Sequence, residues 1–414
     1  KLNASLGADT FSPAASLELP TTADIFFFFF AFFFFSSSAA FAASVGKEVN
    51  YVTSSIEDTL ATLAQYGIPE WQAGGVAELY KLFATGDVST NLPEGNNHTA
   101  TLLGRAPTSV EQFIDAHKQL FGGSPTRVIV LGSSGYVGSA TVKALSALGN
   151  VEVIAGVRNV GAAKNAPLLE TGAKLVRADM SDAESISAIV QKGDRVVVVT
   201  PGAENRADIA TTAVNSAATA GASHIGLISV TSAGSSGIFA GQFRPIETAV
   251  SAAGTNYTIF RLPLFMDNLF GQPIKQASSI YMPAPPTQRF SLITTQDIGE
   301  AVANAIANPA AFTNRIVTLG GTLATGNEIA AAFSAALEKD VKYVQVPNEA
   351  CRKSLTDLGL PGWQADGVVE LYDLIAANDV TTVISEANND TVELLKRPAT
   401  TAAQFAHATK AAFS

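Results

Sequence analysis

From residue 127 onward, short runs of apolar residues alternate with longer stretches in which apolar residues recur at helical spacing. Each run is rich in Val, Ile or Leu and ends in small or polar residues. The runs occupy residues 127–132, 151–159, 174–182, 195–202 and 224–235. Alternation of buried strands with helices is typical of an α/β protein with a parallel sheet. The sequence therefore predicts a doubly wound parallel sheet, with a ligand site at the carboxyl ends of its strands.

The chain also contains an internal repeat. Residues 39–122 match residues 331–414 at a constant offset of 292 without a gap, and 38 of the 84 positions are identical. The shared residues include Trp71 and Trp363 and recur at helical spacings, so we interpret the repeat mainly as packing. We expect 39–122 to be a mainly helical partial copy of the C-terminal region. Residues 122–126 are the best candidate for a domain boundary.

Residues 26–35 contain nine of the 24 phenylalanines, and two interpretations of this tract remain. The uncharged stretch 25–45 has about the 20 residues of a membrane span, but its uninterrupted apolar part reaches only about 16 Å as a helix. Phe and Ser share pyrimidine-rich codons, so the tract is also typical of translated intron sequence. We expect 1–38 to be a low-complexity, disordered or artefactual segment, with membrane association as the alternative.

Composition narrows the class of protein further. The 414 residues include one cysteine and four histidines far apart in the sequence, so we expect neither a disulfide framework nor a metal site. The formal net charge of −10 argues against direct binding to nucleic acid or to an anionic membrane. The composition predicts a globular protein, which we expect to be cytoplasmic.

The first predicted strand runs into a glycine-rich turn that is followed by a helical pattern. The motif GSSGYVG is a variant of the dinucleotide fingerprint. Glycines in such a turn permit a tight bend, bring backbone N–H groups close to a pyrophosphate and let the helix pack on the strand. The candidate cofactor-binding residues of the turn are Gly132, Ser133, Ser134, Gly135, Tyr136, Val137 and Gly138.

A positive charge follows the second predicted strand. Arg158 lies 20 residues after Gly138, where an enzyme selective for NAD(H) usually carries an acid that binds the ribose hydroxyls. An arginine at this place can instead pair with a 2′-phosphate. The sequence therefore favours NADP(H) over NAD(H).

Two further strand ends supply candidate cofactor contacts. Asp179 and Met180 follow the third strand, near the expected position of an adenine. Thr200, Pro201 and Gly202 follow the fourth strand, along the expected path of the dinucleotide. The alternative is that these residues are ordinary turn residues at strand ends.

Several segments together resemble one known family. They are GSSGYVG after RVIVLG, VRN after the second strand, FRLPLFMDN, TTQDIGEAV and the closing QFAHATKAAF. This combination resembles the NmrA-like family of atypical short-chain dehydrogenases over residues 127–414. The resemblance implies a Rossmann domain, expected at 124–270, and a smaller α/β substrate-side domain at 271–414, some strands and helices of which are expected to contribute to the core. It also implies that NAD(P)(H) binds between them.

The chain departs from ordinary short-chain dehydrogenases in its proton-donating residues. Those enzymes use Tyr-x-x-x-Lys, in which the lysine lowers the pKa of the tyrosine, whereas residues 237–250 contain neither tyrosine nor lysine. Ser229 and Thr231 lie at a strand end where such folds often place a catalytic serine. Arg244 is suited to hold a phosphate or a ribose, but not to donate a proton. These three are the candidate catalytic residues.

Two functions of different classes are implied by the resemblance, since some family members are quinone or azo-compound reductases and others are redox-sensing regulators. We expect an NADPH-dependent reductase of a small conjugated acceptor such as a quinone, because this reaction needs orientation more than a positioned proton donor. The expected pocket residues are Phe243, Phe265, Asn268 and Trp363. The alternative is a non-catalytic NADP(H)-sensing regulator that acts through a protein partner.

Overall fold

The protein is described here by a computed structural model. The structure describes residues 41–42, 49, 55–85, 102, 112–114, 125–379, 384 and 389–414. The chain divides into two compact units, residues 1–125 and 126–414. The Phe-rich segment lies outside the described residues. Within the described part, no helix is both long enough and apolar enough to cross a membrane.

The first unit contains two described helices, α3 (Ile56–Gln65) and α4 (Glu70–Thr85). Ser55 begins α3 by accepting a hydrogen bond from the Asp58 N–H at 3.0 Å. At the repeat offset of 292, these helices correspond to α15 (Asn348–Asp357) and α16 (Gly362–Ala376) of the second unit. Most of the predicted partial copy lies outside the described residues, so its full extent stays a prediction.

A parallel seven-stranded sheet forms the centre of the second unit. In spatial order its strands are β10 (Arg315–Thr318), β6 (Asn256–Leu262), β5 (His224–Val230), β4 (Arg195–Val199), β1 (Thr126–Leu131), β2 (Val151–Val157) and β3 (Lys174–Arg177). All neighbouring strands pair in parallel. From β3 inward, the order is that of a Rossmann-like doubly wound sheet with β10 added. The predicted fold class is confirmed.

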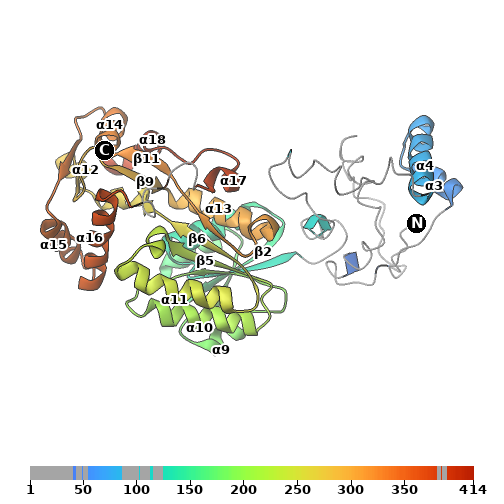
Figure 1. Ribbon diagram of the computed structural model, residues 1–414, viewed down its shortest axis with the longest axis horizontal. Coiled ribbons are helices and arrows are strands. Elements are labelled where there is room, and N and C mark those ends of the chain that lie inside the picture. Colours follow the sequence, from blue (N-terminus) through green and yellow to red (C-terminus); the bar gives the residue numbers. More distant parts are fainter. Residues whose placement is uncertain are drawn as a thin grey trace. The chain divides into compact units, whose positions relative to one another are not determined.

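Helices cover both faces of this sheet (Figure 1). One face carries α7 (Tyr136–Ala147), α8 (Ala166–Leu169), α13 (Thr295–Ala307) and α17 (Thr391–Leu395). The other carries α9 (Ala183–Ser187), α10 (Arg206–Thr219) and α11 (Ile238–Ala252). Because successive side chains of a strand point to opposite faces, Val128 and Val130 enter one core and Ile129 and Leu131 the other. This double burial explains why the strands read as continuous apolar runs.

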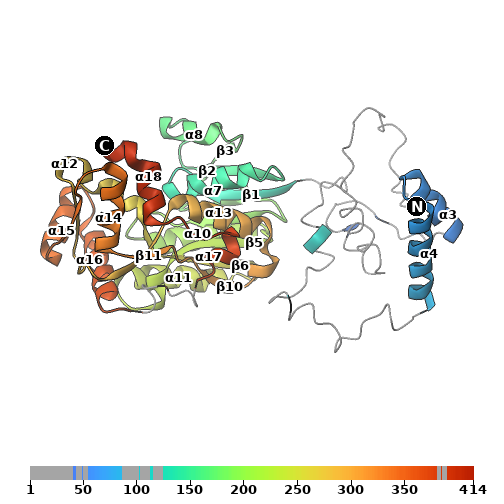
Figure 2. The ribbon, with the colours of Figure 1, turned by 90° about the horizontal axis from the view of Figure 1, so that it is seen from above.

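A smaller α/β part follows the sheet. Its strands are β7 (Leu264–Phe265), β8 (Ser279–Met282), β9 (Arg289–Ile293), β11 (Thr322–Thr325) and β12 (Lys342–Gln345), and its further helices are α12 (Ile274–Ala277), α14 (Gly326–Leu337) and α18 (Ala402–Phe413). Phe290, Phe333 and Phe405 fill its core. Figure 2 shows α14, α15, α16 and α18 gathered at one end of the unit. Two elements that follow residue 271 belong with the seven-stranded sheet: β10 is one of its strands and α13 packs on it. The domain boundary at 270/271 stays a prediction.

Four short 3-10 helices complete the described structure of this unit. They are η3 (Ala163–Asn165), η4 (Thr231–Gly234), η5 (Met266–Gly271) and η6 (Pro309–Phe312). Of these, η4 matters most for the site, because it begins directly after β5 at the carboxyl edge of the sheet.

Candidate functional site

The glycine-rich turn lies between β1 and α7 and is closely packed. Gly132 has φ +79°, and a Cβ at this position would lie 2.8 Å from the Val199 carbonyl oxygen. A Cβ on Gly138 would collide with the Gly132 carbonyl oxygen. Both glycines are therefore required by the turn and by the contact between helix and strand.

Gly135 differs from these two glycines, because the protein itself leaves room for a side chain there. It is the exposed N-cap of α7 in an extended conformation, and an added Cβ would make only an ordinary 3.5 Å contact with the Gly132 carbonyl oxygen. The first N–H groups of a helix have no partner inside the helix. A bare backbone beside free N–H groups and the positive end of a 12-residue helix fits a pyrophosphate.

The side chains of the turn divide into two groups. Ser133 is buried and its hydroxyl donates to the Val130 carbonyl at 2.6 Å, while Val137 packs into the core. Ser134 is half-buried, and Tyr136 is 83% exposed. Ser133 and Val137 therefore hold the turn in place, and Ser134 and Tyr136 are the side chains that remain accessible to a ligand.

A positively charged group lies at the carboxyl ends of β2 and β3. Arg158 is exposed directly after β2. Asp179 accepts hydrogen bonds from the Ser181 N–H and hydroxyl, and these bonds, followed by the charges of Arg158 and Arg177, lower the pKa of Asp179. Arg177, the last residue of β3, is a second cation that the sequence reasoning missed, because it lies inside the predicted run 174–182 and not at its end.

The remaining predicted cofactor residues also lie at this edge. The Met180 methyl group is 3.7 Å from the position of a Cβ on Gly132, so Met180 flanks the glycine turn. Thr200, Pro201 and Gly202 follow β4, and the Thr200 hydroxyl makes a long contact of 3.5 Å with the Ile228 carbonyl. The structure thus brings the predicted cofactor residues to one edge of the sheet, and their role in binding stays a prediction.

A cavity of about 140 Å³ lies at the carboxyl ends of β5 and β6. Its lining residues come from the last positions of β5 and β6, from η4, α10, α11 and α16, and from the turn after β6: Arg206, Val230, Thr231, Ser232, Phe239, Phe243, Leu262, Pro263, Gln364 and Leu371. This is the edge at which open α/β sheets bind ligands. The cavity and the glycine turn therefore share one edge of the sheet.

The structure brings together some of the predicted pocket and catalytic residues but not others. Phe243 and Thr231 line the cavity. Arg206 also lines the cavity, and its guanidinium carbon lies 5.4 Å from the centre of the Trp363 ring. Phe265 packs against the core of the main sheet and Asn268 is exposed on η5, so neither borders the cavity.

Ser229 and Arg244 are held by the protein's own groups. Ser229 is fully buried and its hydroxyl donates to Glu247 Oε1 at 2.6 Å. Arg261 donates to both oxygens of the same carboxylate, at 3.0 and 2.7 Å. Arg244 Nε donates to the Ala233 carbonyl at 2.8 Å. Neither Ser229 nor Arg244 lines the cavity, and their catalytic roles stay predictions.

Arg206 lines the cavity and was missed by the sequence reasoning. It is the first residue of α10, where the helix dipole disfavours a cation. An arginine in that position, after a strand end of a predicted parallel sheet, was a signal that was available in the sequence. Its aromatic neighbours come from distant segments of the chain and gave no such signal.

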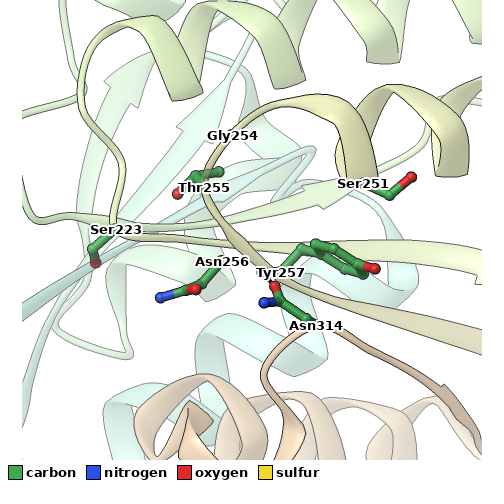
Figure 3. A pocket seen from close by; sticks show the side chains of 7 residues that line it. All are labelled: Ser223, Ser251, Gly254, Thr255, Asn256, Tyr257 and Asn314. Carbon is green, nitrogen blue, oxygen red and sulfur yellow. Dashed lines mark hydrogen bonds between the residues drawn. The ribbon is translucent and has the colours of Figure 1, made fainter.

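A larger hollow, of about 560 Å³, lies at the opposite edge of the sheet (Figure 3). Its lining residues are Ser223, Ser251, Gly254, Thr255, Asn256, Tyr257 and Asn314, which precede or begin β5, β6 and β10. This is the amino edge, remote from the glycine turn. Because open α/β sheets bind ligands at the carboxyl ends of their strands, we take the smaller cavity as the candidate ligand site although the hollow at the amino edge is larger.

Comparison with known proteins gives one family and several relatives. Residues 124–406 match the NmrA-like family. An NAD(P)H azoreductase of Xenophilus azovorans is 30% identical over 298 residues, which cover 69% of this chain and 99% of that protein.

Solved structures show the same fold at lower identity. The NADPH-dependent quinone oxidoreductase QOR2 of Escherichia coli, complexed with NADPH, is 22% identical with a TM-score of 0.59, covering 68% of this chain and 99% of its own. NmrA, a negative transcriptional regulator in complex with NAD, is 14% identical with a TM-score of 0.57, covering 69% and 95%. The family match spans more than half of the chain and agrees with the sheet order and the glycine turn. The chain belongs to the NmrA-like family.

Proposed function

We propose that residues 124–414 bind NADPH and reduce a small conjugated acceptor such as a quinone. The observation that carries the proposal is the position of the aromatic cavity, at the same sheet edge as the glycine turn. The azoreductase relative supports a reductase rather than another activity of the fold.

The residues have separate tasks in this reaction. The glycine turn and the first turn of α7 bind the pyrophosphate, and Phe243, Leu262 and Pro263 exclude water from the acceptor. When bound, the nicotinamide supplies a hydride, and a proton from solvent completes the reduction of a quinone to a hydroquinone. Helix α11 contains neither tyrosine nor lysine. The chain therefore contributes by orienting the acceptor against the nicotinamide and not by donating a proton.

The reductase is tested by the consumption of NADPH with a panel of quinones, followed at 340 nm. Turnover above that of the Gly135→Asp variant supports the proposal, because this substitution places a carboxylate where the pyrophosphate would lie. Equal rates for the two proteins with every acceptor would rule the reductase out.

We further propose that the chain prefers NADP(H) to NAD(H). Arg158 and Arg177 are exposed at the ends of β2 and β3, and both contribute positive charge near Asp179. A 2′-phosphate offers these guanidinium groups charge-assisted hydrogen bonds that a ribose hydroxyl does not.

The second candidate function is an NADP(H)-sensing regulator. The lack of tyrosine and lysine in α11 favours it, and NmrA shows that a regulator can share this fold. Tight NADPH binding without turnover of any acceptor, together with a protein partner whose affinity changes with NADPH, distinguishes the regulator from the reductase.

For residues 39–122 we propose a partial duplicate of the C-terminal segment. The observation in its favour is that its two described helices match α15 and α16 at the repeat offset of 292. Limited proteolysis tests this organisation. We expect the first cut near residues 122–126 and a resistant product that begins close to Thr126. Resistance of this junction would contradict the proposal.

A further inference from the structure

Arg206 is a buried cation for which the described residues supply no carboxylate partner. The residue is 7% exposed and occupies the first position of α10. Its Nε donates to the Ala203 carbonyl at 3.3 Å, and among the residues that the structure describes no carboxylate pairs with its guanidinium. A buried charge without a counter-ion is costly, so the arrangement calls for a compensating interaction.

Three aromatic rings supply part of that compensation. The guanidinium carbon lies 4.9 Å from the centre of the Phe243 ring, 5.4 Å from that of Trp363 and 5.9 Å from that of Phe239. In such contacts the negative face of each ring attracts the guanidinium charge. Desolvation lowers the pKa of Arg206 to about 10, so it stays charged at neutral pH. The N-terminus of α10 adds positive potential at the same place.

One carboxylate of α16, the helix that carries Trp363, is already engaged elsewhere. Glu370 lies on α16 with Trp363, and its Oε2 accepts a hydrogen bond from the Ile238 N–H at 2.7 Å. Glu370 therefore accepts from the first backbone N–H of α11 and does not pair with Arg206. The positive charge of Arg206 remains available at the cavity surface.

The cavity beside Arg206 has a polar side and an apolar side. Thr231, Ser232 and Gln364 offer hydroxyl and amide groups, whereas Leu262, Pro263 and Leu371 are apolar. Its volume of about 140 Å³ is close to that of an apolar protein cavity of about 150 Å³ that binds benzene. The space is therefore suited to one aromatic ring that carries a polar substituent.

We propose that Arg206 binds an anionic substituent, a carboxylate or a sulfonate, on the aromatic acceptor. This inference rests on the proposed reductase and specifies its substrate class. The acceptor ring packs against Phe243 and Leu262, and its acidic group replaces the missing counter-ion of Arg206. The planar guanidinium suits both groups, since it donates two parallel hydrogen bonds to adjacent oxygens.

The kinetic experiment compares 1,4-benzoquinone-2-sulfonate with 1,4-benzoquinone, both single-ring acceptors, in the wild-type chain and in Arg206→Met. The measured quantity is the ratio of kcat/KM for the sulfonated acceptor to that for the neutral one. We expect this ratio to fall about 10- to 100-fold in the variant, the range of a lost hydrogen bond to a charged group. An unchanged ratio in a folded variant would overturn the proposal.

Arg315→Met is the matched control variant. Arg315 also lies over an aromatic ring, 5.5 Å from the centre of Phe312, but it begins β10 at the amino edge of the sheet. We expect it to keep the wild-type ratio. Arg206→Lys retains the charge without the planar fork and should give an intermediate ratio. NADPH affinity is measured in the same variant. If Arg206→Met weakens NADPH binding by as large a factor as it lowers the ratio, Arg206 binds the cofactor and not the acceptor, and the proposal is overturned.

A binding experiment separates this inference from the reductase itself. Benzenesulfonate and benzyl alcohol are titrated into the full chain and its Arg206→Met variant by calorimetry. Tighter binding of the sulfonate that depends on Arg206, without turnover of any quinone, would uphold the anion site and refute the reductase. Quinone turnover with no Arg206-dependent preference in either experiment would uphold the reductase and refute the anion site.

Discussion

The two edges of the seven-stranded sheet differ in how their charged side chains are satisfied. At the amino edge, Arg127 pairs with Asp194 at 3.0 Å and Arg195 donates to the Ile306 carbonyl at 3.0 Å. At the carboxyl edge, Arg158 is exposed and Arg206 is buried without a carboxylate partner among the described residues. Arg261 and Glu247 are paired at the carboxyl edge, so Arg158 and Arg206 are the cations through which we expect a ligand to bind there.

The comparison also shows why cavity volume is a poor guide in this protein. The hollow at the amino edge measures about 560 Å³ and the cavity at the carboxyl edge about 140 Å³. The larger hollow is lined by polar turn residues, among which Asn314 already accepts from the Tyr257 N–H. The smaller cavity combines aromatic rings with a cation that has no carboxylate partner among the described residues. It is therefore the site with binding free energy still to be gained.

The strongest test of this comparison places one aspartate at each edge. Gly135→Asp puts a carboxylate against the expected pyrophosphate, and we expect NADPH affinity to fall about 100-fold or more, roughly 3 kcal/mol. Asn256→Asp places a carboxylate at the larger hollow by an isosteric change of an exposed residue, and should change the affinity less than about twofold. Isothermal titration calorimetry measures both. A reversed order of effects would move the cofactor to the amino edge.

A smaller effect is expected from the cation after β2. Arg158→Ala should weaken NADPH binding about 10- to 30-fold, because one charge-assisted contact to the 2′-phosphate is lost. NADH lacks this phosphate, so its affinity serves as the internal control and should change little. Equal losses for the two cofactors would show that Arg158 acts on the fold or on another part of the nucleotide.

The sequence contains the information for the strands and for the glycine turn, because both depend on local chemistry. Runs such as 126–131 are apolar on both faces, and Gly132 needs its positive φ whatever surrounds it. The short strand β10 was not predicted. Its four residues, two of them exposed, carry too weak a pattern, and it forms because β6 offers an open edge for pairing.

The cage around Arg206 was beyond sequence reasoning for a different reason. Phe239 and Phe243 lie on α11 and Trp363 on α16, and only the folded chain brings them to the start of α10. The repeat pointed to Trp363 as a packing residue, and it does pack, but its partner is a cation and not an apolar core. Trp71, at the equivalent position of the first unit, is exposed instead.

The amino edge offers a test through pH, since His224 is buried there. The Thr258 hydroxyl donates to the Phe312 carbonyl at 2.9 Å and therefore accepts from His224 Nε2, at 2.9 Å. Burial, followed by the charge of Arg195, lowers the pKa of His224 to about 4 from an ordinary 6.5. The unfolded chain thus binds a proton below pH 6.5 that the folded chain refuses until about pH 4.

Stability should consequently fall as the pH drops through this window, by up to about 1.4 kcal/mol per pH unit from this histidine. His224→Gln retains a donor but does not titrate, so it should remove this part of the slope. Urea unfolding of both proteins between pH 4.5 and 7.5 measures the difference. Parallel curves for the two proteins would mean that His224 is not held neutral by the fold.

The smallest expected effect concerns a carboxyl-edge residue whose polar group is already satisfied. Ser229 is fully buried and donates to Glu247, which Arg261 also binds. Ser229→Ala should therefore lower the free energy of unfolding by about 1 kcal/mol, the worth of one hydrogen bond, while quinone turnover stays within about twofold. Arg261 continues to neutralise Glu247 in this variant, which limits the loss. A fall in kcat of about 100-fold with unchanged stability would instead place Ser229 among the reacting groups. A polar side chain at the carboxyl edge is thus not expected to bind a ligand when, like that of Ser229, it already has a hydrogen-bond partner within the protein.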